Sequence, residues 1–115
     1  MKKSLLVICV GTLCLGVLSF AAVQSKRPLP VPGDASRGRK VFEIQCEGCH
    51  EPNGTTVKVG PGLQRLFKRG KLANGNQCNE SSVRSMIESG SKTMPSFAQL
   101  RNGDKDDLIA YLKSL

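Results

Sequence analysis

The sequence predicts an all-α domain of about three main helices plus a short helical turn, with loops between them. Three segments place apolar residues at helical spacing behind a residue that favours helix N-termini. No segment carries a strand signal, and the stretches between the helical ones are rich in Gly, Pro, Asn and Thr, which is typical of loops. The folded part, residues 34–115, has 82 residues, too few for a generous apolar core.

Residues 1–21 have the order of a secretory signal peptide. Lys2 and Lys3 precede an uncharged apolar run, and small residues that fit a cleavage site follow at 19–21. The alternative is an uncleaved membrane anchor over residues 5–23, because 19 uncharged residues are about enough to span a bilayer as a helix. Either interpretation predicts export, to the periplasm or to the outer face of the cytoplasmic membrane.

Residues 22–33 are predicted to be a linker, since three prolines and two cations occur within its last ten residues. The formal charge of the chain is +8, and 15 basic and 9 acidic side chains remain without Lys2 and Lys3. Such a balance favours solubility, or attraction to an acidic protein or membrane surface. Nucleic acid is excluded as a partner by the few aromatic residues and the lack of a binding motif.

The first predicted helix begins after Asp34, a favourable N-cap residue. Its helical spacing is carried by Gly38, Val41, Phe42 and Gln45. The second helix follows Asn79 as N-cap and stops at Gly90, with Val83, Met86 and Ile87 on one face.

The third helix is predicted to begin at an Asp104 cap, with Asp106 and Asp107 in its first turn. Its apolar face consists of Leu108, Tyr111, Leu112 and Leu115. The short helical turn is expected at residues 63–67, and loops at 51–62, 70–77 and 92–100.

The motif Cys46-Glu47-Gly48-Cys49-His50 is the attachment sequence of haem c. Its two thiols can form thioethers with the haem vinyl groups, and the adjacent histidine supplies an iron ligand. A zinc site of these three residues with Cys78 is an alternative, although ligation by the consecutive Cys49 and His50 strains a tetrahedron. A thioredoxin-like disulfide would need a βαβ context that the sequence lacks.

The chain resembles class I cytochrome c over essentially all of residues 34–115. Four blocks carry the resemblance in the family's order: 38–42 (GRKVF), 46–50 (CEGCH), 60–63 (GPGL) followed by 66–69 (LFKR), and 107–113 (DLIAYLK). The resemblance implies the cytochrome c fold wrapped around one covalent haem c, with the first and last helices crossing where Gly38 allows close approach.

The resemblance also implies roles for single residues. Cys46 and Cys49 would carry the thioethers, and His50 would bind iron through Nε2 while the Pro61 carbonyl holds its Nδ1–H. Met94, before a proline in the last loop, would be the second axial ligand, whereas Met86 on a helical face is expected to pack in the core. Arg69 matches a family arginine that pairs with a haem propionate, and a solvated surface arginine is the alternative.

These residues predict an exported carrier of single electrons between redox proteins. Iron bound by both His50 and Met94 has no open position, so neither catalysis nor a small-molecule substrate is expected. Basic residues around the haem edge either steer an acidic partner or form a solvated face; they are Lys58, Lys68, Arg69, Lys71 and Lys92.

Two other functions remain open. An electron-entry domain or subunit of a membrane-tethered oxidoreductase complex would use the same chemistry, and an uncleaved 5–23 helix would favour it. An open-site haem enzyme or gas binder would need Met94 absent or displaceable, and His50 is the only histidine. Cys78 is expected to be a partly buried, inert thiol.

Overall fold

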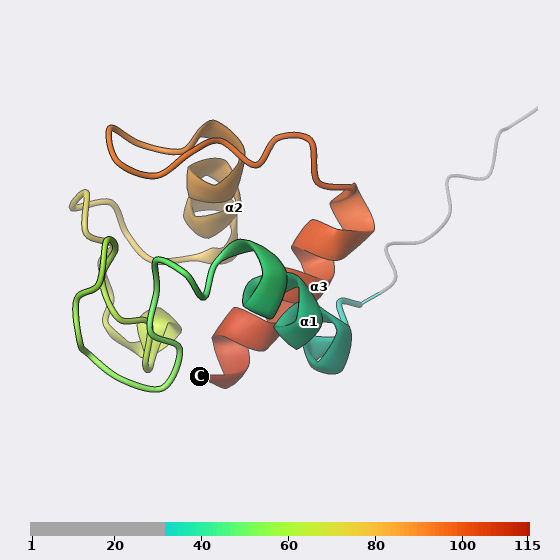
Figure 1. Cartoon of the computed structure of the whole chain (residues 1–115), viewed down its shortest axis with the longest axis horizontal. Coiled ribbons are helices and arrows are strands. Elements are labelled where there is room, and N and C mark those ends of the chain that lie inside the picture. The colour runs from blue at the N-terminus through green and yellow to red at the C-terminus, as the bar shows by residue number, and fades with distance from the viewer. Residues whose placement is uncertain (1–31) are drawn as a thin grey trace, which may run out of the picture.

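The computed structural model describes residues 32–115 and confirms the all-α prediction (Figure 1). Its elements are α1 (Ala35–Gln45), the single 3₁₀ turn η1 (Leu66–Lys68), α2 (Glu80–Ser89) and α3 (Asn102–Ser114). Within this range the only strand-like pairing is an isolated bridge between Lys71 and Gln77. The signal peptide (1–21), the alternative anchor (5–23) and most of the linker (22–33) lie outside the described residues. No helix among residues 32–115 is long and apolar enough to cross a membrane.

Helices α1 and α3 cross in close contact (Figure 1). Gly38 is buried at the crossing, and a Cβ atom on it would lie 1.9 Å from the carbonyl oxygen of Asp107. Only glycine therefore lets the two backbones meet at this spacing. One turn along, the ring of Phe42 packs against that of Tyr111 with centroids 5.4 Å apart. The predicted crossing at Gly38 is present.

Two N-caps confirm the predicted starts of α1 and α2. The Asp34 carboxylate accepts a hydrogen bond from the Arg37 N–H at 2.9 Å. Asn79 and Ser82 form a reciprocal capping box, in which each side chain binds the backbone N–H of the other. Gly90 ends α2 with φ of 69°, a backbone conformation that glycine adopts without strain.

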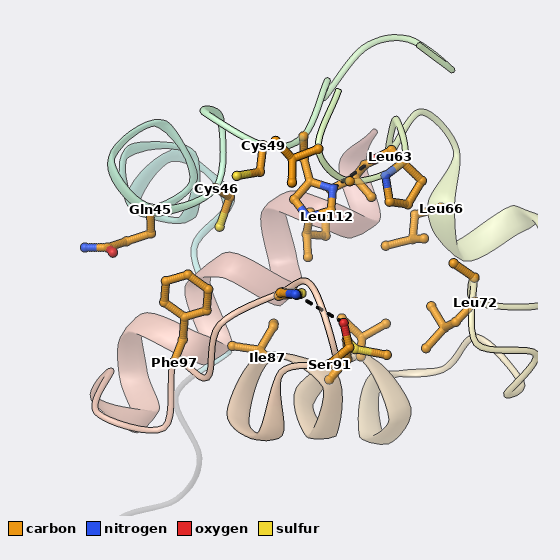
Figure 2. Close-up of a pocket in the computed structure, with 18 of the residues that line it drawn as sticks. Gln45, Cys46, Cys49, Leu63, Leu66, Leu72, Ile87, Ser91, Phe97 and Leu112 are labelled. Carbon is orange, nitrogen blue, oxygen red and sulfur yellow. Dashed lines mark hydrogen bonds between the residues drawn. The ribbon is translucent and has the colours of Figure 1, made fainter. Parts of the chain in front are cut away.

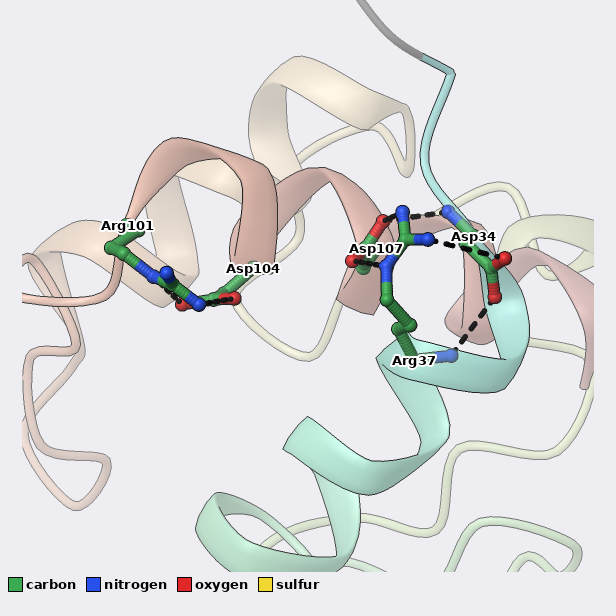
Figure 3. A network of polar contacts seen from close by, with 5 residues as sticks. All are labelled: Asp34, Arg37, Arg101, Asp104 and Asp107. Carbon is green, nitrogen blue, oxygen red and sulfur yellow. Dashed lines mark hydrogen bonds and ion pairs between the residues drawn. The ribbon is translucent and has the colours of Figure 1, made fainter.

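The predicted start of α3 is wrong. The helix begins at Asn102, and its first backbone bond runs from the Lys105 N–H to the Arg101 carbonyl at 3.1 Å. Asp104 therefore lies inside the helix, where its carboxylate forms an ion pair with Arg101 instead of capping the backbone (Figure 3). The two following aspartates lie beyond the first turn.

Asp107 instead joins α3 to the start of α1 (Figure 3). Its buried carboxylate accepts two hydrogen bonds from the Arg37 guanidinium, at 2.7 and 2.9 Å, and one from the Asp34 N–H at 2.7 Å. The Arg37 bonds, followed by the Asp34 bond, hold the pKa of the Asp107 carboxyl below its usual range.

The buried apolar residues surround a cavity and do not pack into a continuous centre. The eight residues are Phe42, Leu63, Leu66, Val83, Ile87, Leu108, Ile109 and Leu112. All of them except Ile109 line this cavity. The domain thus places its apolar side chains around a space that they do not fill.

Candidate functional site

The cavity has a volume of about 380 Å³ and lies between the loop that follows α1 and the layer formed by α2 and the last loop. Figure 2 shows Cys46 and Cys49 on one side of it, with Ile87 and Ser91 on the other. Five of the six predicted site residues line it, namely Cys46, Cys49, His50, Pro61 and Met94. Its remaining walls are mainly aliphatic and aromatic, so it suits a large apolar ring system.

A tight turn at the end of α1 presents the motif residues to the cavity. The Cys46 N–H completes the helix by bonding the Phe42 carbonyl at 2.8 Å. The Cys46 carbonyl then accepts from the N–H groups of Cys49 and His50, at 3.0 and 2.9 Å. This turn brings both sulfur atoms and the imidazole to one wall.

The Cys46 thiol is chemically unlike the reactive thiol of a redox disulfide motif. Both cysteines are free, and Cys46 is half-buried whereas Cys49 is exposed. Burial, with a smaller contribution from Cys49, raises the pKa of the Cys46 thiol to about 11. Redox Cys-x-x-Cys motifs depend on a lowered thiol pKa, so this environment does not support that alternative.

The imidazole of His50 is fixed by the segment that begins at Gly60. Its Nδ1 lies 2.8 Å from the Pro61 carbonyl oxygen, which can only accept a hydrogen bond. Nδ1 is therefore the donor, so Nε2 is the nitrogen that faces a metal when the ring acts as a ligand. A Cβ atom on Gly60 would lie 2.3 Å from His50 Cε1, so the ring packs directly on this glycine. Gly60 was not among the predicted site residues, although its place before Pro61 was a usable signal.

Met94 lies in the loop between α2 and α3, half-buried against the cavity. Its carbonyl accepts from the Ser91 N–H at 2.8 Å, and its own N–H donates to Ser91 Oγ at 3.3 Å (Figure 2). Met86 of α2 also lines the cavity and is half-buried, and its packing in the core of the haem-bearing protein stays a prediction.

Arg69 does not line the cavity. Its guanidinium donates to the Gly62 carbonyl at 2.8 Å and to the Gln64 carbonyl, which ties η1 to the segment after Pro61. Cys78 is half-buried against the core, and no set of three His, Cys, Asp or Glu side chains within residues 32–115 converges as a metal site. The zinc arrangement with Cys78 is therefore not formed.

Most carboxylates are neutralised by ion pairs within the domain. Eight of the nine Asp and Glu side chains, all of which fall in residues 32–115, pair with a cation. Lys58 is one of these cations, because it binds Glu51 at 3.7 Å. Six cations of the described chain have no carboxylate partner: Lys40, Arg65, Lys68, Arg69, Lys71 and Lys92. Four of the six lie within residues 65–71, so the free positive charge is concentrated there.

The fold and the cavity define a small haem-bearing electron-transfer domain: a thiol pair and an oriented imidazole face a space of the right chemical character. The sequence matches the family described as "Cytochrome C oxidase, cbb3-type, subunit III" over residues 33–112. The chain belongs to the cytochrome c family, in class I, and carries one covalent haem c with its iron.

Known relatives agree with this assignment. Cytochrome c of Tetrahymena pyriformis is 35% identical, over 72% of this chain and 90% of its own length. Cytochrome c6 of Cyanidium caldarium is 23% identical over 99% and 94% of the two chains. The structure of cytochrome c6 from Phaeodactylum tricornutum superposes with a TM-score of 0.56 at 27% identity, covering 71% of this chain and 93% of that one. The protein is thus an electron carrier of the cytochrome c and c6 type.

Some relatives are much longer than this chain, which spans about a quarter of their length. "Cytochrome c oxidase subunit 2" of Alkalihalophilus pseudofirmus is 32% identical over 70% of this chain, which spans about a quarter (25%) of that protein.

Proposed function

We propose that the chain is an exported single-electron carrier whose haem is attached through Cys46 and Cys49 and whose iron is bound by His50 and Met94. The main support for this proposal is that His50, with its Nε2 available to a metal, and the thioether of Met94 line the same cavity. When bound, the cofactor supplies an iron that exchanges one electron between its ferrous and ferric states.

The site residues attach the haem, orient the iron-binding imidazole and offer hydrogen-bond donors. Cys46 and Cys49 would hold the haem covalently: each S–H would add across a vinyl group, which needs no leaving group or oxidant. Pro61 accepts the Nδ1 hydrogen bond that orients His50. Arg69 uses two of its five N–H groups on backbone carbonyls, which leaves donors for a haem propionate.

Ligation by both His50 and Met94 separates a carrier from an open-site enzyme or gas binder. In the oxidised protein, we expect a low-spin iron and the weak red charge-transfer band of an iron–thioether bond. Met94→Leu should abolish this band, lower the reduction potential and let cyanide or carbon monoxide reach the iron. Met86→Leu is the matched control, because it replaces the other cavity methionine and should leave the band in place. An unchanged spectrum in Met94→Leu would refute the ligand assignment.

The docking of redox partners is assigned to the cationic segment 65–71, with acidic protein surfaces as the complementary partner. The double variant Lys68→Gln, Lys71→Gln should slow electron transfer to an acidic partner at low salt and weaken its dependence on ionic strength. Lys40→Gln, an unpaired cation on α1, is the control. Equal effects in the two variants would argue for a solvated face instead.

Export is proposed from Lys2, Lys3 and the apolar run that follows them. Intact-mass measurement of protein from its native host should show loss of about the first 21 residues. The alternative of a membrane-tethered electron-entry subunit is favoured by the match to a domain of a longer oxidase subunit, and it predicts the whole chain in the membrane fraction. Uncleaved soluble protein in the cytoplasm would contradict both.

A further inference from the structure

Lys105 is a buried cation that does not line the haem cavity. It lies in the first part of α3, and its side chain is only 6% exposed. Its ammonium donates to the Glu88 carboxylate of α2 at 3.1 Å and to the Ala98 carbonyl of the last loop at 3.2 Å. One side chain of α3 therefore binds both α2 and the loop that carries Met94.

Backbone and side-chain contacts also bind this loop to α2. The chain folds back after Gly90, where a Cβ atom would lie 2.4 Å from the Met94 carbonyl oxygen. The Phe97 N–H then donates to the Ile87 carbonyl at 2.8 Å, and Ser96 Oγ donates to the Glu88 carbonyl. These contacts connect the loop to α2, and the Lys105–Ala98 bond adds the connection to α3.

The Lys105 contacts are better suited to fixing a position than to adding stability. Removing an ammonium from water is costly, and a buried ion pair often stabilises a fold no more than apolar side chains of the same size would. The Glu88 carboxylate is 39% exposed, so water can solvate it if the lysine is lost. The ammonium does, however, define where the loop sits relative to both helices.

We propose that Lys105 is a positioning residue for Met94: by clamping Ala98 between α2 and α3, it holds the loop so that the thioether stays on the iron. This inference rests on the proposed ligation by Met94. It assigns Lys105 no contact with the haem.

The test compares Lys105→Met with Lys113→Met in the oxidised holoprotein. Both lysines connect α3 to α2, but Lys113 pairs with Glu80 at the other end of α2 and forms no hydrogen bond with the loop. The first measurement is the rate at which saturating cyanide replaces the thioether, which requires the loop to open. Lys105→Met should raise this rate roughly tenfold, which corresponds to the loss of a hydrogen bond worth about 1.4 kcal/mol.

The second measurement is amide hydrogen exchange, which does not depend on iron ligation. In Lys105→Met, the Phe97 amide should exchange faster while the Leu108 amide in the centre of α3 keeps its protection. Lys105→Arg should restore both values, and Lys113→Met should match the wild type. If Lys105→Met does not fold, Glu88→Ala removes the other end of the pair and should shift both readouts in the same direction by a smaller factor.

Three results would overturn the inference or its basis, and they are distinguishable. A wild-type protein without the thioether band refutes the ligation by Met94 itself. A wild-type band together with unchanged cyanide and Phe97 rates in Lys105→Met refutes only the positioning role. Equal acceleration of the Phe97 and Leu108 amides would show that Lys105 supports the whole fold.

Discussion

At the crossing of α1 and α3, two backbones touch through Gly38 and the side chain of Phe42 is 1% exposed. On the other side of the same phenylalanine, the loops and α2 enclose a cavity of about 380 Å³. The crossing is formed by the protein's own atoms alone, whereas the cavity walls surround a space that suits the haem. One half of the domain is therefore specified by side-chain packing, and the other half depends on the cofactor that occupies it.

Preventing covalent attachment of the haem should have the largest effect on stability, because half of the domain depends on the cofactor. Cys46→Ala with Cys49→Ala should give a protein without covalent haem. Leaving the cavity empty costs at most about 9 kcal/mol at about 24 cal/mol per Å³, comparable to the whole stability of a small domain. We expect the variant to be largely unfolded by circular dichroism, and haem staining after denaturing electrophoresis reports attachment. A cooperative unfolding transition at the wild-type denaturant concentration would contradict the dependence on haem.

The crossing can be broken without touching the cavity. In Gly38→Ala, the new methyl group would collide with the Asp107 carbonyl and push the helices apart, at a cost of about 3 kcal/mol. Gly103→Ala is the matched control, because a Cβ atom there meets nothing within 4 Å and alanine favours a helix by about 0.5–1 kcal/mol. Urea unfolding of both holoproteins measures the difference. Equal stability of the two variants would show that the backbones of α1 and α3 are not in close contact at Gly38.

Replacing Asp107 tests how the stability of the helix crossing depends on pH, and we expect the smallest change in stability from this variant. Because the pKa of Asp107 is lower in the folded than in the unfolded chain, its stabilisation is present above the unfolded pKa of about 3.9 and is lost as pH falls through the folded value. Asp107→Asn should lower stability at neutral pH and flatten the decline below about pH 4. Glu47→Gln, at the one Asp or Glu side chain of residues 32–115 that forms no ion pair, is the control for the acid profile. An unchanged acid decline in Asp107→Asn would assign the pH dependence to other groups.

Local chemistry made much of the fold predictable. Asp34, Asn79 and Gly90 mark helix ends because capping is decided within a few residues. The same rule failed at Asp104, which was predicted to cap the last helix although that helix has already begun at Asn102. There the aspartate pairs with Arg101 and does not compete for the backbone.

The site was predictable where spacing alone determines placement, as in the turn that presents Cys46 and His50. Contacts between residues that are distant in the sequence were not predictable in this way. The Asp107 carboxylate finds Arg37 at a separation of 70 residues, and the burial of Lys105 depends on a loop and a second helix. Met86 shows a different limit: an apolar helical face does not reveal whether it meets side chains or a cavity.

The entry of the chain into the domain has a mechanical consequence. A Cβ atom on Gly33 would lie 2.1 Å from the Asp106 carbonyl, and the Asp34 N–H binds the Asp107 carboxylate. Tension arriving from the N-terminal segment is thus delivered to α3 and the helix crossing. Because Lys105 of α3 also binds the loop that carries Met94, a pull on the linker would reach the surroundings of the iron through this helix.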